Sequence, residues 1–201
     1  FVFITGRAGT GKSTLLRTFR EETSLVFPVL APTGVAALNV SAETIHRFFR
    51  FAPGMTLKDA RRRGLSRRED PLFKAIDGFI IDEISMVRAD LIDCIDAFLQ
   101  AALDTPAPFG GKRIIAIGDL AQLPPVLSRH EQEAFKQAYE TPYFFSASAT
   151  QTLLATNQFS FLELETVYRQ TDPEFIRLLN AVRDQRPARE DLDTLNQRWG
   201  K

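Results

Sequence analysis

A chain of 201 residues, 44% hydrophobic and 10% aromatic, is long and apolar enough to bury a full core, and we expect one domain over residues 1–201. Its 25 basic and 25 acidic residues cancel, which excludes attraction to nucleic acid through overall charge and leaves only a local patch. The single cysteine, Cys94, excludes a disulfide framework and a thiol cluster for zinc.

Short apolar runs alternate with segments of helical period, which is typical of a parallel sheet covered by helices on both faces. We therefore predict an α/β fold. The predicted strands, in chain order, are Phe1–Thr5, Pro28–Ala31, Phe79–Asp82, Ile114–Ile117 and Phe159–Leu164. The predicted helices are Ser13–Glu22, Arg88–Leu103 and one that begins at Pro173.

The termini and the apolar runs predict a fragment of a longer protein that does not enter a membrane. Phe1 already lies in a predicted strand, and no terminating element precedes Lys201. No apolar run approaches the roughly 20 residues that cross a bilayer, and no leader precedes the first strand. We expect a protein that is not secreted, cytoplasmic in a bacterium or nuclear or mitochondrial in a eukaryote.

The segment Pro53–Pro71 has the least regular pattern in the chain. It carries the one charge asymmetry in the sequence, which consists of Arg61, Arg62, Arg63, Arg67 and Arg68. Charge runs are usually solvated, so a surface loop explains these arginines. A patch that tracks the phosphates of a nucleic acid is the alternative.

A phosphate-binding loop, Gly6-Arg7-Ala8-Gly9-Thr10-Gly11-Lys12-Ser13, directly follows the first strand. Its glycines allow backbone N–H groups to point into one hollow at a helix N-terminus, where negative charge is favoured. Lys12 would reach the β- and γ-phosphates, and the Ser13 hydroxyl would bind Mg²⁺. The ATP-binding residues that we predict are Gly6, Ala8, Gly9, Thr10, Gly11, Lys12, Ser13 and Thr14.

An acid pair, Asp82-Glu83, follows another predicted strand. Such a pair often only caps a helix, but a phosphate loop needs a second anion for the metal and a base for water. We predict that Asp82 holds Mg²⁺ and that Glu83 polarises the attacking water.

The strand Ile114–Ile117 ends in Gly118–Val126, and ligands gather at the carboxyl ends of parallel strands. Gln122 would then contact the γ-phosphate, or be a solvated residue of a rigid loop.

Six blocks in this order resemble the Pif-type helicases of superfamily 1, relatives of the RecD subunit that move 5′ to 3′ on single-stranded DNA. The matching blocks are Gly6–Ser13, Ala31–Ala37, Thr44–Phe49, Ile81–Val87, Gly118–Val126 and Val167–Gln170. They span about 165 residues, which is far more specific than the loop alone. The resemblance implies a RecA-like P-loop NTPase domain that uses ATP and Mg²⁺ and binds single-stranded DNA.

The resemblance also implies roles for further residues. Arg169 would reach the γ-phosphate as an arginine finger. The predicted DNA contacts are Thr33 and Gly34 on the phosphates, and His46, Phe48 and Phe49 beside the bases. A place in the core is the alternative for each phenylalanine, because the chain has 17 of them.

The chain departs from the family's pattern because it lacks the second RecA-like domain and the adenine-contacting segment before the first strand. We therefore expect the isolated fragment to bind nucleotide weakly, hydrolyse it slowly and leave duplex DNA intact. Three alternatives stay open: the helicase part of a relaxase or a recombination nuclease subunit, a P-loop kinase or other NTPase, and a degenerate binding module.

Overall fold

The computed structural model describes residues 1–170, 172–184 and 186–197, and its centre is a six-stranded sheet in which all strands run parallel. The strand order is β3-β2-β4-β5-β1-β6. The strands are β1 (Val2–Gly6), β2 (Val29–Ala31), β3 (Glu43–Thr44), β4 (Gly78–Ile81), β5 (Arg113–Ile117) and β6 (Ser160–Leu164). The five predicted strands are confirmed, each within one residue of its predicted ends, and the short β3 was not predicted.

Helices surround the sheet and fill most of the connections. They are α1 (Lys12–Glu22), α2 (Gly34–Asn39), α3 (Ile45–Phe49), α4 (Leu57–Leu65), α5 (Pro71–Ala75), α6 (Ala89–Leu103), α7 (Gln132–Ala138), α8 (Ser148–Ala155), α9 (Pro173–Arg183) and α10 (Arg189–Asn196). Single 3₁₀ turns are η1 (Ile84–Met86), η2 (Pro108–Gly111) and η3 (Phe144–Ser146). The predicted helices correspond to α1, α6 and the start of α9. In the described residues, no helix is long and apolar enough to span a bilayer.

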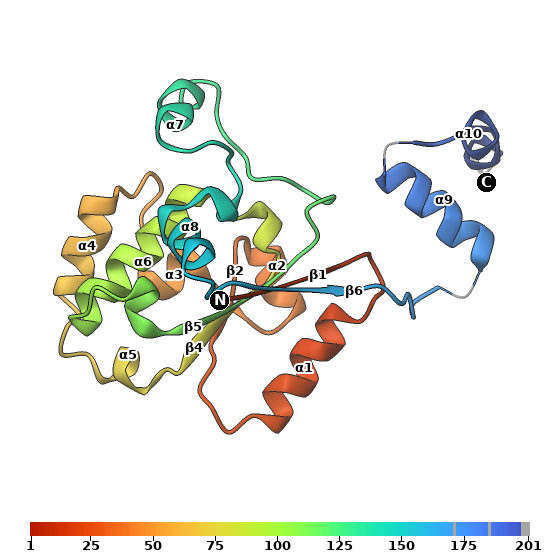
Figure 1. Ribbon diagram of the computed structural model, residues 1–201. Coiled ribbons are helices and arrows are strands. Elements are labelled where there is room, and N and C mark those ends of the chain that lie inside the picture. Colours follow the sequence, from red (N-terminus) through yellow and green to blue (C-terminus); the bar gives the residue numbers. More distant parts are fainter. Residues whose placement is uncertain (171, 185, 198–201) are drawn as a thin grey trace.

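Alternate residues of each strand face opposite sides of the sheet, and this divides the core in two. Phe3 and Phe79 belong to a large cluster with residues of α6 and α8. Their neighbours Ile4 and Ile80 belong to a smaller cluster with Leu16 of α1. Figure 1 accordingly shows α1 on one side of the sheet and α6 and α8 on the other. The prediction of a parallel sheet covered on both faces is confirmed.

The segment Pro53–Pro71 is more regular than the sequence indicated, because it contains α4. Thr56 caps this helix by accepting a hydrogen bond from the Asp59 N–H at 3.2 Å. The buried face of α4 carries Ala60 and Gly64, and a Cβ at Gly64 would lie 2.3 Å from the Phe98 carbonyl oxygen of α6. Small residues that admit such a close approach leave no strong apolar stripe, so hydrophobic periodicity missed the helix.

The carboxyl ends of β4, β5 and β1 lie side by side because these strands are neighbours in the sheet. The phosphate loop, the acid pair and the Gly118–Val126 segment therefore leave the sheet at one edge. Figure 1 shows α9 and α10 beyond β6, away from the helices that cover the sheet.

Candidate nucleotide site

The loop Gly6–Ser13 joins β1 to α1 through glycines that other residues would replace only with strain. Gly9 and Gly11 have φ angles of 83° and 92°, in the left-handed region. Gly6 lies against the neighbouring strand β6, since a Cβ there would approach the Leu164 carbonyl oxygen to 2.6 Å. The Thr10 side chain turns into the loop, where its hydroxyl donates to the Arg7 carbonyl at 2.9 Å. These contacts fix the backbone at the N-terminus of α1.

Lys12 places its ammonium group over this loop. Its Nζ donates to the carbonyl oxygens of Gly6 at 2.5 Å and of Arg7 at 3.1 Å. Burial lowers the pKa of Lys12, while the carboxylates of Asp119, Glu83 and Asp82 act in the opposite direction. The side chain is thus a cation held between the loop and three acidic groups.

The acid pair stands where β4 ends in a tight turn. Asp82 accepts a hydrogen bond from the Glu83 N–H at 3.0 Å, and Glu83 has a left-handed φ of 51°. Burial raises the pKa of Asp82. Burial and the adjacent Asp82 raise the pKa of Glu83, and Lys12 opposes both effects. A carboxylate with a raised pKa is a stronger base, which suits a group that takes a proton from water.

Asp119 follows β5 and is almost completely buried, with 1% of its surface exposed. Its Oδ1 accepts hydrogen bonds from the Ala121 N–H at 3.0 Å and from Arg183 Nη2 at 2.9 Å. Its Oδ2 accepts from Gln122 Nε2 and from Arg183 Nε, both at 3.3 Å. Burial by itself raises the pKa of Asp119, but these hydrogen bonds outweigh it and lower the pKa below its usual value.

One cavity brings most of the predicted nucleotide residues together. Its volume is about 440 Å³. It is lined by Ala8, Gly9, Gly11, Lys12, Ser13, Thr14, Glu83, Gln122, Tyr168 and Arg169. All four residues predicted to act in catalysis are in this set, although they come from four separate segments. Gly6, Thr10 and Asp82 do not line it; Gly6 and Thr10 belong to the same loop, and Asp82 precedes Glu83.

Arg169 reaches the cavity because its segment is tied to the phosphate loop. The carbonyl oxygen of Gly9 accepts hydrogen bonds from the N–H of Tyr168 at 2.8 Å and of Arg169 at 3.3 Å. A Cβ at Gly9 would lie 2.7 Å from Cβ of Arg169, so only glycine allows this approach. The backbone after β6 thereby delivers Arg169 to the site.

The predicted DNA residues lie on and after the loops that follow β2 and β3. Thr33 caps α2 by accepting a hydrogen bond from the Ala36 N–H at 3.2 Å, and Gly34 is exposed at the first position of that helix. His46 is half-buried in α3, and burial lowers its pKa, which favours the neutral imidazole. Thr33, Gly34 and His46 retain their predicted role as a hypothesis.

The prediction that Phe49 contacts bases is wrong. Only 2% of its surface is exposed, and its ring packs on those of Phe51, Phe73, Phe79 and Phe98. A ring enclosed in this way is part of the core and has no free face for a base. Phe48 is half-buried and packs edge-on against Phe49, Phe73 and Phe79, so it too serves the core.

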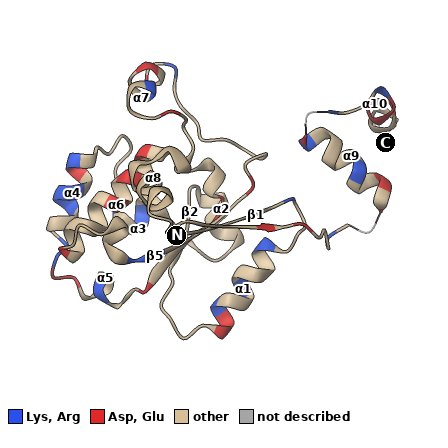
Figure 2. Ribbon diagram, viewed as in Figure 1, with Lys and Arg blue, Asp and Glu red and all other residues tan. Residues whose placement is uncertain are grey.

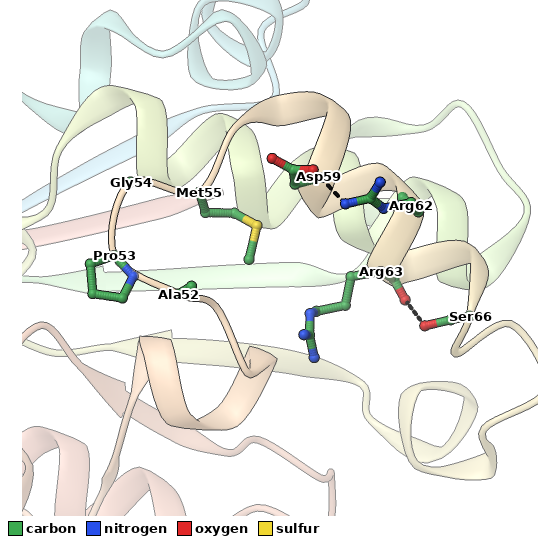
Figure 3. Close-up of a pocket in the computed structure, with 8 residues that line it drawn as sticks. All are labelled: Ala52, Pro53, Gly54, Met55, Asp59, Arg62, Arg63 and Ser66. Atoms are coloured by element: carbon green, nitrogen blue, oxygen red, sulfur yellow. Dashed lines mark hydrogen bonds and ion pairs between the residues drawn. The ribbon is translucent and has the colours of Figure 1, made fainter.

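The arginines of the segment Pro53–Pro71 are largely matched by acidic partners. Arg62 pairs with Asp59 at 2.7 Å, Arg67 pairs with Asp70, and Arg68 pairs with Asp104. Figure 2 shows the basic residues of α4. Arg62 and Arg63 line a cavity of about 630 Å³ together with Pro53 and Met55, and Figure 3 shows these side chains. This pairing favours a solvated helix face over a strip that tracks phosphates.

The sequence reasoning gave no role to Asp119 or Arg183. Asp119 lies inside the Gly118–Val126 block, and a carboxylate directly after a buried strand was a signal of the same kind as Asp82. Arg183 carried no local signal, because its partner is 64 residues away in the chain. Only the fold brings the two together.

The chain is similar to known proteins in sequence and in structure. A model of the PIF1-like helicase family matches residues 1–192. ATP-dependent DNA helicase RRM3 of Saccharomyces cerevisiae is 32% identical over 189 residues, which cover 90% of this chain and 25% of that protein. Human ATP-dependent DNA helicase PIF1 is 37% identical over 188 residues, which cover 90% of this chain and 27% of that protein. The chain thus spans about a quarter of the length of these curated relatives.

Solved structures show the same relationship. The crystal structure of Pif1 helicase from Bacteroides in complex with ADP-AlF3 and ssDNA superposes with a TM-score of 0.82 at 37% identity, over 96% of this chain and 44% of that one. Pif1 helicase from Candida albicans superposes with a TM-score of 0.75 at 30% identity, over 94% of this chain and 42% of that one.

Proposed function

This chain belongs to the PIF1-like helicase family, and from that membership we propose that it is the first motor domain of an ATP-dependent DNA helicase. In the complete protein, ATP hydrolysis at the Gly6–Ser13 loop would drive 5′ to 3′ movement along single-stranded DNA. The observation in the structure that supports ATP hydrolysis is the convergence of Lys12, Glu83, Gln122 and Arg169 on one cavity.

The residues of the cavity match the needs of phosphoryl transfer to water. Backbone N–H groups of the loop and the Lys12 ammonium would hold the β- and γ-phosphates. Glu83 would accept the proton of the attacking water, and its raised pKa supports that role. Gln122 and Arg169 would contact the γ-phosphate, where negative charge grows as the bond breaks.

The donor groups present fit a magnesium ion bound together with nucleotide. Ser13 offers a hydroxyl at the cavity, and Asp82 offers a carboxylate next to Glu83. In the described residues, no group of three or more His, Cys, Asp or Glu side chains could hold a metal ion. Mg²⁺ at phosphate sites takes only one or two protein ligands, and phosphates and water complete its shell. The ion would neutralise charge on the β- and γ-phosphates.

Single-stranded DNA would run over the loops that follow β2 and β3. Thr33 and Gly34 would contact its phosphates, which position a strand without reading its sequence. His46 would lie against a base, in keeping with its half-buried position. Phe48 has a weaker claim, since its ring already packs against the core.

The test compares the complete protein with the isolated residues 1–201. We expect the complete protein to hydrolyse ATP, to do so faster with single-stranded DNA, and to unwind a duplex with a 5′ single-stranded tail. The isolated segment should bind nucleotide weakly, hydrolyse it slowly and leave the duplex intact. A complete protein without DNA-stimulated hydrolysis contradicts the proposed activity. A segment that unwinds as fast as the complete protein contradicts the division of labour between domains.

A further inference from the structure

A bidentate ion pair joins the end of α9 to the edge of the sheet. Arg183 approaches both carboxylate oxygens of Asp119, through Nη2 at 2.9 Å and through Nε at 3.3 Å. The carboxylate is buried, with its side chain 2% exposed, whereas the arginine side chain is 27% exposed. Such a geometry fixes the plane of the carboxylate as well as its charge.

The same carboxylate holds Gln122. Oδ2 of Asp119 accepts from Gln122 Nε2 at 3.3 Å, and Oδ1 accepts from the Ala121 N–H at 3.0 Å. Each carboxylate oxygen of Asp119 therefore accepts one hydrogen bond from Arg183 and one from the Gly118–Val126 segment. Gln122 in turn lines the nucleotide cavity beside Lys12 and Arg169. A change at Arg183 would reach the nucleotide through one intermediate carboxylate.

The contact between Arg183 and Asp119 places the end of α9 close to the phosphate loop. A second cavity, of about 270 Å³, separates apolar side chains of α9 from Arg7 and Ala8 of the phosphate loop. Arg183 lines this cavity together with Asp119 and Gln122. The other arginine of α9 in an ion pair, Arg177, binds Asp191 of α10 instead. Of the two arginines of α9, Arg183 is thus the one that contacts a residue beside the nucleotide cavity.

We propose that Arg183 is a positioning residue for ATP hydrolysis, which orients Asp119 so that Asp119 holds Gln122 against the γ-phosphate. This inference rests on the proposed function, because it assigns a further residue to the same reaction. It also links the reaction to α9, since any shift of α9 relative to the sheet moves the guanidinium that orients Asp119. Gln122 and Arg169, which precedes α9 in the chain, would respond to that shift together.

The test measures kcat, the KM for ATP and the affinity for ADP in the complete protein. Arg183→Ala should lower kcat by about 10-fold or more, because a buried carboxylate loses its charged partner and Gln122 loses its fixed acceptor. ADP affinity should stay within about twofold, since ADP has no γ-phosphate for Gln122 to contact. Arg177→Ala, the matched control on the same helix, should keep the wild-type kcat.

A double-variant cycle separates positioning from a merely structural brace. If Arg183 acts through Gln122, Arg183→Ala should reduce kcat little further in a protein that already carries Gln122→Ala. If Arg183 only held α9 in place, the double variant would instead show the full loss of kcat from Arg183→Ala in addition to the loss from Gln122→Ala. Arg183→Lys, which keeps the charge but not the bidentate geometry, should fold like the wild type and show an intermediate kcat.

The outcomes assign failure to one proposal or the other. If the wild-type protein hydrolyses ATP and Arg183→Ala has the same kcat, this inference alone is overturned. Fully additive losses of kcat in the double-variant cycle overturn it as well. If Arg183→Ala does not fold, a wild-type kcat in Arg183→Lys overturns it. A wild-type protein that hydrolyses no ATP overturns the proposed function and this inference with it.

Discussion

The phosphate loop and the segment Thr33–Phe49 each carry a block that predicted contact with a ligand, but the fold uses their side chains in different ways. Around the loop, Lys12 and Glu83 meet at a cavity. In the other segment, Phe49 is enclosed in the core and Phe48 packs against it. Ammonium and carboxylate groups have no favourable place in an apolar core, whereas an aromatic ring fits a core and a stacked base equally well.

This difference explains why the charged residues predicted around the loop lie at a cavity, whereas Phe49 lies in the core. A motif of glycines and charged residues has few structural uses, so finding it already limits where its residues lie. An aromatic motif has two uses, and local sequence does not distinguish them. The four predictions that follow test this contrast, from the largest expected effect to the smallest.

Glu83→Gln should reduce the rate of ATP hydrolysis by about 10² to 10⁴-fold, because the amide cannot accept the proton of the attacking water. ATP binding should remain near the wild-type value, since the loop is unchanged. Steady-state ATPase assays and nucleotide titrations measure the two quantities. Glu22→Gln, at the exposed end of α1, is the control and should match the wild type. Retained turnover in Glu83→Gln would mean that another group is the base.

Phe49→Ala should lower the free energy of unfolding by about 3–5 kcal/mol, because it leaves a cavity among five other rings. Urea unfolding measures the change. Phe161→Ala provides the comparison, since that ring on β6 is 60% exposed and its loss should cost much less. Unchanged stability together with lost affinity for single-stranded DNA would return Phe49 to the DNA surface.

His46→Ala should weaken the binding of single-stranded DNA by about 1–3 kcal/mol, the range for one stacked base. Hydrolysis of ATP without DNA should not change. Fluorescence titration of a labelled oligonucleotide measures the affinity, and His130→Ala, the chain's second histidine, serves as the exposed control. The opposite pattern, with ATPase lost and DNA affinity kept, would place His46 with the nucleotide or the core.

Gly9→Ala and Gly111→Ala separate the strain of a left-handed backbone from the need for space. Both glycines have positive φ angles, 83° and 76°, so each substitution should cost about 1–2 kcal/mol of stability. Only Gly9 also lies against Arg169, whereas nothing lies within 4 Å of a Cβ at Gly111. ATP binding, followed by calorimetry, should therefore weaken in Gly9→Ala alone. Equal binding in both variants would show that the contact with Arg169 is dispensable.

The sequence by itself determined five strands of the described sheet and named most of the residues that meet at the candidate nucleotide site. Apolar runs of strand length, alternating with helical segments, identified five strands, because burial on both faces of a parallel sheet requires such runs. The loop Gly6–Ser13 was evident because a glycine-rich loop of this pattern has few other purposes. The pair Asp82-Glu83 could by itself only cap a helix, and it gained its predicted role from the presence of that loop. A short stretch of sequence was enough to predict each strand and the loop, because each depends on residues that are close together in the chain.

Tertiary structure alone decided what depends on contacts between distant segments. The small residues of α4 become a helix face only against α6. The ring of Phe49 becomes core only among rings from five other positions. Arg183 acquires a partner 64 residues away, and that partner holds Gln122. A sequence lists the residues that are able to make such contacts, but the choice among them follows from the packing of the whole chain.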